Sequence, residues 1–275
     1  MTAKEPYGEE FWRGFLSGGH SRERVGRRIF KVIPHAPRCR LCAAPFAGAG
    51  APLMRLIGKR PSDKNPNWCN SCFVFMSDHH GGAEIDVTML FADVRGSTTL
   101  AEGMSSADFR ALMDRFYDTA AKVIFDNDGF VDKFVGDELV SMFFPLLSGE
   151  KHAARAVDAA RALLEATGHA EPGGPWVPIG VGVHTGVAWV GAVGTGTRTE
   201  LTALGDAVNT TARLASAATA GEILVTADAA AAAGLDSNLE RRSLELRGKQ
   251  RSTEVIALTV SPAPATGDYE APLAR

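Results

Sequence analysis

The chain has 275 residues, of which 45% are hydrophobic and 22% are charged, and its formal net charge is −3. This length suits one large domain, or one domain with a smaller module. The composition excludes collagen-like, fully disordered and disulfide-dense proteins. No run approaches the roughly 18 apolar residues of a membrane-spanning helix, and the first residues lack the apolar core of a secretory signal. We therefore expect a cytoplasmic protein without a transmembrane segment.

Charge is distributed unevenly along the chain. Residues 1–60 contain 12 Lys and Arg against 4 Asp and Glu, whereas the other 215 residues contain 17 against 28. A basic segment of this kind can meet nucleic acid, an anionic membrane or an acidic protein surface. Because its basic and aromatic residues do not alternate as in a base-stacking surface, we expect no nucleic-acid partner.

The first 36 residues are expected to form a basic helical segment with one or two short amphipathic helices. Its apolar side chains are Phe11, Trp12, Phe15, Leu16, Val25, Ile29, Phe30, Val32 and Ile33. Residues 37–80 are rich in loop-forming residues and contain all four cysteines. We expect this second segment to be a small module with a metal ion at its centre.

The cysteines form two CxxC pairs, Cys39 with Cys42 and Cys69 with Cys72. Two such pairs supply four thiolates to one tetrahedral ion, which favours structural zinc, with an iron–sulfur cluster as the alternative. Redox-active or free cysteines are the third interpretation, and a reducing cytoplasm argues against structural disulfides. A metal would also stabilise a module whose core is small. The neighbouring His79 and His80 are not needed to complete a four-cysteine site.

Residues 84–260 alternate between strand-like and helix-like patterns. Alternating apolar residues from Ile85 to Phe91 predict a strand that ends at Asp93. An apolar i, i+3, i+4 pattern from Phe109 to Ile124 predicts a helix, with Ser105 and Asp108 as a capping box at its start. Residues 130–135 and 138–144 then predict a β-hairpin with Gly136 and Asp137 in its turn.

A second helix is expected over 151–166, and a second hairpin over 177–193 that turns at residues 184–186. The glycines of GVHTG (182–186) and VGAVG (190–194) are interpreted as tight hairpin geometry. A third helix should begin near Asp206, and short strands should follow near Ile223 and Ile256. The order β-α-β-β-α-β predicts an α/β (α+β) fold of the ferredoxin-like type. Residues 261–275 are rich in Pro and Ala and are expected to be a disordered tail.

Asp93 and Asp137 would lie close together if the first hairpin pairs beside the first strand. Two adjacent carboxylates repel each other unless a cation neutralises them, and Mg²⁺ prefers oxygen ligands of this kind. The alternative is that both are turn residues whose side chains bond nearby backbone amides.

Three blocks of sequence weigh on this choice: FADVRGSTTLAE (91–102), GFVDKFVGDELVSMF (129–143) and LTALGDAVNTTARL (201–214). Together they resemble the class III nucleotidyl cyclases, the adenylate and guanylate cyclase family, over about residues 85–258. The resemblance implies that Asp93, Asp137 and the Val94 carbonyl bind two Mg²⁺ or Mn²⁺ ions that hold a nucleoside triphosphate. It also implies that Asn209 orients the ribose and that Arg213 stabilises charge on the α-phosphate.

The same resemblance addresses substrate choice. Lys133 matches the adenine-binding lysine of adenylate cyclases, and Thr202 falls where many members have an aspartate, whereas guanylate cyclases typically have glutamate and cysteine. The pair therefore favours ATP, and the threonine variant is similar to a bacterial and soluble subgroup that includes bicarbonate-stimulated enzymes. Arg247 stands where the family has a phosphate-binding lysine; Lys249 is the alternative, since guanidinium and ammonium groups bind phosphate differently.

Family members are dimers in which the metal-binding aspartates of one chain face the Asn and Arg of the other. The resemblance thus implies an adenylate cyclase that acts as a homodimer with two composite sites. The cysteine module lies outside the resemblance, and our hypothesis is that it regulates or positions the dimer through metal binding or redox state. Two alternatives stay open. One is a guanylate cyclase, and the other is a catalytically silent cyclase-like module that binds a nucleotide or a partner.

Overall fold

An eight-stranded sheet forms the centre of the fold in a computed structural model that describes residues 8–18, 21–34, 37–194, 199–245 and 252–260. The strand order is β2-β3-β1-β4-β6-β8-β7, and β5 pairs with β4 beside this path. Its strands are β1 (Gly81–Val94), β2 (Phe130–Val135), β3 (Glu138–Phe143), β4 (Ile179–Val193), β5 (Glu200–Leu204), β6 (Glu222–Thr226), β7 (Arg241–Leu244) and β8 (Thr253–Thr259).

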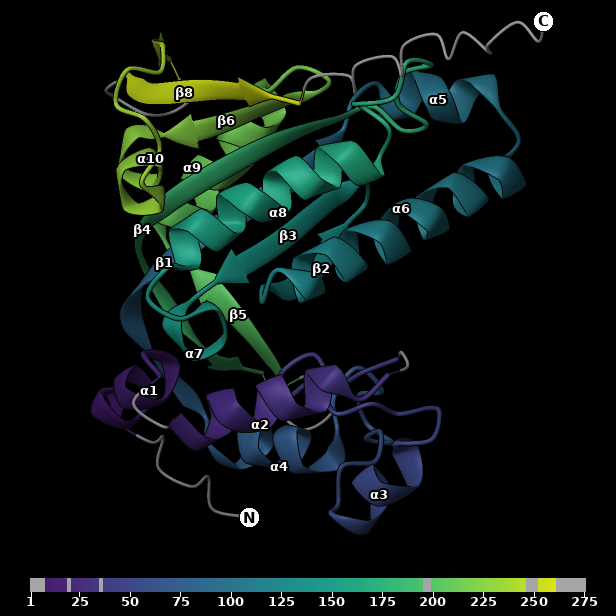
Figure 1. Cartoon of the computed structure of the whole chain (residues 1–275), viewed down its shortest axis with the longest axis vertical. Helices are drawn as coiled ribbons and strands as arrows, with labels where there is room; N and C mark the ends of the chain where they lie inside the picture. Colours follow the sequence, from purple (N-terminus) through teal and green to yellow (C-terminus); the bar gives the residue numbers. More distant parts are fainter. Residues whose placement is uncertain (1–7, 19–20, 35–36, 195–198, 246–251, 261–275) are drawn as a thin grey trace, which may run out of the picture.

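Helices cover both faces of this sheet (Figure 1). One face packs against α6, α8 and α10, and the other packs against α9 and the N-terminal helices. The helices are α1 (Glu9–Leu16), α2 (Ser21–Val32), α3 (Ala51–Leu56), α4 (Asn70–Asp78), α5 (Ser97–Gly103), α6 (Ser106–Asp126), α7 (Pro145–Ser148), α8 (His152–Ala166), α9 (Asp206–Ala217) and α10 (Ala227–Ala233). None of those described is both long and apolar enough to cross a membrane.

The expected ferredoxin-like order is present as β1, α6, β2, β3, α8 and β4, so the predicted fold class is confirmed. Helix α6 begins where the capping pattern predicts, because the Ser105 hydroxyl oxygen accepts a hydrogen bond of 3.1 Å from the backbone N–H of Asp108. The first hairpin is also confirmed, with Gly136 in the left-handed region at φ 61°.

The prediction of a second hairpin is wrong. Residues 179–193 form one continuous strand, β4, which pairs with β1 from Ile179 to Ala192. Its glycines serve close packing rather than a turn. A Cβ on Gly182 would lie 2.5 Å from the backbone nitrogen of Ala215 in α9, and one on Gly191 would lie 2.3 Å from the Gly81 carbonyl oxygen. Glycine is therefore required in β4 because other backbone approaches the strand closely.

Residues 8–80, called the N-terminal module below, pack against the end of the sheet where β1 begins (Figure 1). Trp12, Phe15 and Leu16 of α1 share one hydrophobic core with Ile85 and other residues of the sheet. Where the sequence predicted one or two N-terminal helices, the structure has two, α1 and α2.

Helix α2 differs from the expected amphipathic pattern. It buries Arg27, which is 3% exposed, while Val25, Ile29 and Val32 point into solvent. The reason is that the Arg27 guanidinium donates hydrogen bonds to the carbonyls of Leu41 (2.6 Å) and Arg40 (3.0 Å). Because these buried backbone oxygens require a hydrogen-bond donor, Arg27 rather than the apolar residues of α2 occupies the buried face.

Candidate functional site

The end of β1 and the β2–β3 turn bring Asp93 and Asp137 into one region. Antiparallel pairing of β1 with β3 places Asp93 opposite Glu138, the residue after Asp137. The backbone N–H of Val94 also donates to the Asp137 carbonyl, at 3.3 Å. Two segments about 40 residues apart in sequence are thereby joined directly at the predicted metal ligands.

The electrostatics of this region fit a cation. Burial raises the pKa of Asp93, Arg95 lowers it, and the charge of Asp137 raises it further. Burial and the charges of Asp93 and Asp137 also raise the pKa of Glu138 to about 7. These shifts are those of carboxylates that repel one another in a half-buried place, and a divalent ion with oxygen ligands relieves such repulsion.

Arg95 is a residue of this site that the sequence reasoning missed. Its guanidinium forms an ion pair with the Asp93 carboxylate and donates a hydrogen bond of 2.9 Å to the carbonyl of Ser216, at the end of α9. Arg95 therefore links the acidic end of β1 to the helix that carries Asn209 and Arg213. The only signal in the sequence was a basic residue two positions after the aspartate.

Asn209 and Arg213 lie one turn apart on α9, as predicted. Asn209 is exposed and Arg213 is half-buried. Within the described residues, neither side chain has a hydrogen bond or ion pair, and so neither is joined to Asp93 or Asp137. Among the described residues of one chain, the structure thus brings the aspartates together and shows no hydrogen bond or ion pair between them and the Asn–Arg pair.

Lys133 and Thr202 come together although they lie on different strands, β2 and β5. The Lys133 ammonium donates to the Thr202 hydroxyl oxygen at 3.3 Å. The Thr202 hydroxyl in turn donates to Oδ2 of Asp132 at 2.6 Å. Asp132 is a second residue that the sequence reasoning missed, and its place directly before Lys133 carried no independent signal.

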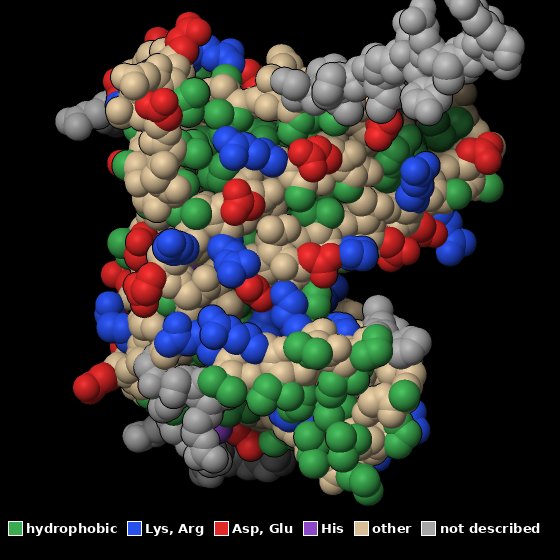
Figure 2. All heavy atoms as spheres, in the orientation of Figure 1, with side chains coloured by type: hydrophobic (Ala, Val, Ile, Leu, Met, Phe, Trp, Pro, Cys, Tyr) green, Lys and Arg blue, Asp and Glu red, His purple; other side chains and the backbone are tan. Residues whose placement is uncertain are grey.

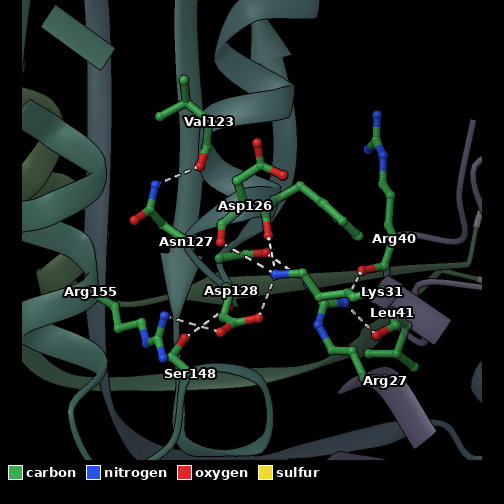
Figure 3. Close-up of polar contacts among 12 residues, drawn as sticks. Arg27, Lys31, Arg40, Leu41, Val123, Asp126, Asn127, Asp128, Ser148 and Arg155 are labelled. Carbon is green, nitrogen blue, oxygen red and sulfur yellow. Dashed lines mark hydrogen bonds and ion pairs between the residues drawn. The ribbon is translucent and has the colours of Figure 1, made fainter. Parts of the chain in front are cut away.

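The N-terminal module contacts the chain segment that leads into Lys133. In Figure 3, Lys31 from α2 and Arg155 from α8 reach Asp128 from opposite sides. The Lys31 ammonium lies 2.8 Å from Oδ1 and the Arg155 guanidinium 3.2 Å from Oδ2. Asp128 itself has φ 61°, a left-handed backbone conformation that is uncommon for residues other than glycine.

Contacts with the module continue along the next four residues. Arg27 donates to the Gly129 carbonyl at 3.5 Å, and the Trp68 and Phe130 rings pack at 6.0 Å between centroids. Arg40, inside the first CxxC pair, donates to the carbonyls of residues 131 and 132 at 3.4 and 3.5 Å. Figure 2 shows Lys and Arg side chains gathered where the module meets the sheet. The basic segment therefore faces the acidic body of its own chain.

The four predicted cysteine ligands also come together. Their sulfur atoms all lie within 4.8 Å of one another, and Cys42 and Cys69 are separated by 3.7 Å. The backbone N–H of Cys69 donates to the Cys39 sulfur at 3.2 Å. This cluster has the donor set and the spacing to bind a metal ion. Arg247, Lys249 and the tail at 261–275 lie outside the described residues.

Comparison with known proteins places the site in a family context. A family model described as the adenylate and guanylate cyclase catalytic domain matches residues 82–258. The chain is 35% identical over 146 residues to adenylate cyclase 1 of Rhizobium meliloti (strain 1021), and 30% identical over 139 residues to an adenylate cyclase of Anabaena cylindrica. These matches cover 50% and 46% of this chain, but only 22% and 26% of those two relatives.

Two solved structures resemble the fold to the same degree. The guanylyl cyclase Cya2 aligns with a TM-score of 0.58 and 26% identity, covering 68% of this chain and 98% of that one. The adenylyl cyclase CyaB from P. aeruginosa aligns with a TM-score of 0.58 and 27% identity, covering 66% of this chain and 97% of that one. Because the family model matches residues 82–258, well over half of its length, this chain belongs to the adenylate and guanylate cyclase catalytic domain family.

Proposed function

We propose that this chain is an adenylate cyclase that converts ATP to 3′,5′-cyclic AMP and pyrophosphate in a homodimer with composite sites. The observation that supports the proposal is that Asp93 and Asp137 lie together at one end of the sheet. On the same chain, a hydrogen bond joins Lys133 and Thr202. The first pair suits a metal-bound triphosphate, and the second suits a purine base.

The acidic end of β1 is the proposed metal site. When bound there, two Mg²⁺ or Mn²⁺ ions would neutralise the triphosphate and favour loss of the ribose 3′-hydroxyl proton. Asp93, Asp137 and the Val94 carbonyl would hold the ions, and Arg95 would orient the Asp93 carboxylate, which it already contacts. Positioning and charge neutralisation are the main tasks of a protein in phosphoryl transfer.

Helix α9 would complete the site of the other protomer. Asn209 and Arg213 have no hydrogen-bond or ion-pair partner among the described residues, so both are available to a ligand. Asn209 would orient the ribose, and Arg213 would stabilise the negative charge that develops on the α-phosphate. Two head-to-tail chains would then form two equivalent sites, each with aspartates from one chain and the Asn–Arg pair from its partner.

Overall similarity does not distinguish ATP from GTP as the substrate, because an adenylyl and a guanylyl cyclase structure align equally well. The proposed preference for adenine is therefore based on Lys133. The ammonium of Lys133 is a donor only, which suits the unprotonated N1 of adenine and not the N1–H of guanine. We therefore favour ATP over GTP.

Assay of the purified chain with ATP or GTP and Mn²⁺ tests this function. We expect cyclic AMP to form with a kcat/KM at least about 10-fold above that for GTP, since one hydrogen bond to a charged group is worth roughly 1.5–3 kcal/mol. The double variant Lys133→Glu, Thr202→Cys should shift the preference toward GTP. Arg110→Ala, an exposed arginine of α6, is the control and should leave both rates unchanged. Preferential formation of cyclic GMP would contradict the proposal, and no cyclic product from either nucleotide would favour a silent module.

For the cysteine cluster we propose a single structural zinc ion. Four sulfurs about 2.3 Å from one tetrahedral ion lie about 3.8 Å apart, close to the 3.7 Å between Cys42 and Cys69. An iron–sulfur cluster divides its cysteines among several irons, which would move some sulfurs farther apart. The spacing within 4.8 Å therefore favours one ion.

The charges around the cluster support the same proposal. Zinc with four thiolates carries a net charge of about −2, and the cationic Arg27 and Lys59 line one pocket with Cys42 and Cys72. Burial lowers the pKa of Lys59, but the charges of the cysteines raise it overall. Two buried or half-buried cations beside four cysteines fit a doubly negative metal centre.

Removal of this zinc should destabilise the module and weaken ATP binding. We expect one zinc per chain in colourless protein, and loss of zinc with a lower melting temperature in Cys42→Ser and Cys72→Ser. Because the module contacts residues 128–132, loss of zinc should displace the strand that carries Lys133 and raise KM for ATP by roughly 10-fold or more. A displacement of about 1 Å can lower the efficiency of an enzyme by about 100-fold. Ser71→Ala, on the second CxxC turn, is the control. Stoichiometric iron with visible absorbance would contradict zinc, and an unchanged KM in zinc-free protein would contradict the positioning role.

A further inference from the structure

Strand β2 contains a β-bulge at Asp132. In its ladder with β3, Val131 pairs with Ser141 and Lys133 pairs with Val140, so Asp132 is the additional residue between two consecutive partners. A bulge breaks the alternation of side chains and redirects one of them. Here it allows the neighbouring side chains of Asp132 and Lys133 both to reach Thr202.

The bulge is held from outside the sheet by the first CxxC turn. The carbonyls of Val131 and Asp132 accept hydrogen bonds from the Arg40 guanidinium at 3.4 and 3.5 Å. Burial lowers the pKa of Arg40, and the charge of Asp132 opposes that shift. Arg40 thus satisfies backbone oxygens at the irregular point of the strand.

The Asp132 carboxylate is buried with few partners. Its side chain is 3% exposed. Oδ2 accepts the Thr202 hydroxyl at 2.6 Å and lies 3.6 Å from the Lys133 ammonium, whereas Oδ1 has no hydrogen-bond partner among the described residues. Burying a carboxylate with an unsatisfied oxygen costs stability. Buried polar atoms without a partner are rare in native proteins, so the placement of Asp132 calls for an explanation.

The hydrogen bond to Asp132 determines what the Thr202 hydroxyl can offer to a ligand. A hydroxyl has one proton to donate and two lone pairs that accept. The Thr202 proton is committed to Asp132, and one lone pair accepts from Lys133. What remains is one lone pair, so Thr202 can only accept from a further group.

We propose that Asp132 is a positioning residue that makes Thr202 a selective acceptor for the 6-amino group of adenine. Position 6 of adenine carries an amino donor, whereas guanine and hypoxanthine carry a carbonyl acceptor that would face the Thr202 lone pair. A threonine alone discriminates poorly between these bases, because a hydroxyl can also donate. With its proton held by Asp132, it discriminates as a carboxylate would. This inference rests on the proposed adenylate cyclase function.

The variant Asp132→Asn tests the inference with ATP and inosine triphosphate, two nucleotides that lack a 2-amino group and differ at purine positions 6 and 1. An asparagine amide can donate to Thr202, which frees the Thr202 proton to bond a 6-oxo group. We expect kcat/KM for ATP to fall by roughly 10- to 100-fold, and the ATP-to-inosine-triphosphate ratio to fall by at least about 10-fold. Asp132→Glu, which keeps the acceptor, should retain more of that ratio, and Asp114→Asn, on the exposed face of α6, should leave it unchanged.

Binding of 3′-deoxy-ATP and 3′-deoxyinosine triphosphate, measured by calorimetry in Mn²⁺, gives a readout that does not depend on turnover. The ratio of the two dissociation constants should change in Asp132→Asn as the kinetic ratio does. An unchanged ratio in a folded variant, or an equal loss for both nucleotides, would overturn the inference and indicate a purely structural role. Wild-type protein that binds these nucleotides selectively but forms no cyclic product would contradict the proposed function alone.

Discussion

Replacing Asp93 with asparagine should reduce cyclase turnover by roughly 1,000-fold or more, the expected loss when several kcal/mol of charge stabilisation at a metal-bound triphosphate are removed. Asparagine keeps the size of the side chain and one oxygen but removes the negative charge. Burial and the charge of Asp137 raise the pKa of Asp93 and Arg95 lowers it, with a net rise, so loss of the negative charge should not by itself unfold the variant. The measurement is kcat with ATP at saturating Mn²⁺, together with a melting curve.

Asp86→Asn is the matched control for this variant. Asp86 lies on the same strand, seven residues before Asp93 in the sequence. Unlike Asp93, it has an exposed side chain, with 61% of its surface accessible. Its replacement should change turnover less than about 2-fold, as surface substitutions usually do. A folded Asp93→Asn protein with wild-type turnover would refute the metal site at the end of β1.

Mixing two inactive variants should restore activity. Asp93→Ala and Arg213→Ala proteins should each be nearly inactive, because each homodimer lacks one essential group at both sites. In an equal mixture about half of the dimers are mixed, and each mixed dimer has one intact site and one doubly defective site. Activity should therefore recover to about a quarter of the wild-type value per chain.

Dimer exchange must be confirmed for this experiment, for example by energy transfer between differently labelled chains. A mixture of Asp93→Ala with Asp137→Ala is the control, since both changes affect the same half of the site and no mixed dimer regains an intact one. Exchange without recovery in the first mixture would contradict the shared site. Recovery in the control mixture would contradict it equally.

Local patterns in the sequence predicted the elements that carry the site. The Ser105 cap, the apolar face of α6 and the Gly136–Asp137 turn depend on residues within one or two helical turns of each other, and all three are present. The two CxxC pairs are also short-range patterns, and their four cysteines lie together as predicted. Their spacing alone left the choice between zinc and an iron–sulfur cluster open. The structure adds that all four sulfurs lie within 4.8 Å of one another.

Errors and omissions arose where distant segments pack together. The glycines of β4 indicated a turn, but they accommodate α9 and β1, which lie far away in the sequence. Arg27 is polar in a helix expected to bury an apolar face, and its partners are carbonyls in the CxxC turn. The contact of Asp132 with Thr202 spans 70 residues and depends on a bulge that no local pattern indicated.

By its residue types and short-range spacing, the sequence determined the main helices, the first hairpin and the family resemblance, and it indicated the candidate cation ligands. Only the tertiary structure decided that β4 is continuous, that Arg95 contacts Asp93, and that the cysteine module holds the strand with Lys133. The reason is physical. Caps, turns and periodicity are short-range preferences of the backbone, whereas strand register, close backbone approach and buried hydrogen bonds depend on which distant groups the folded chain brings together.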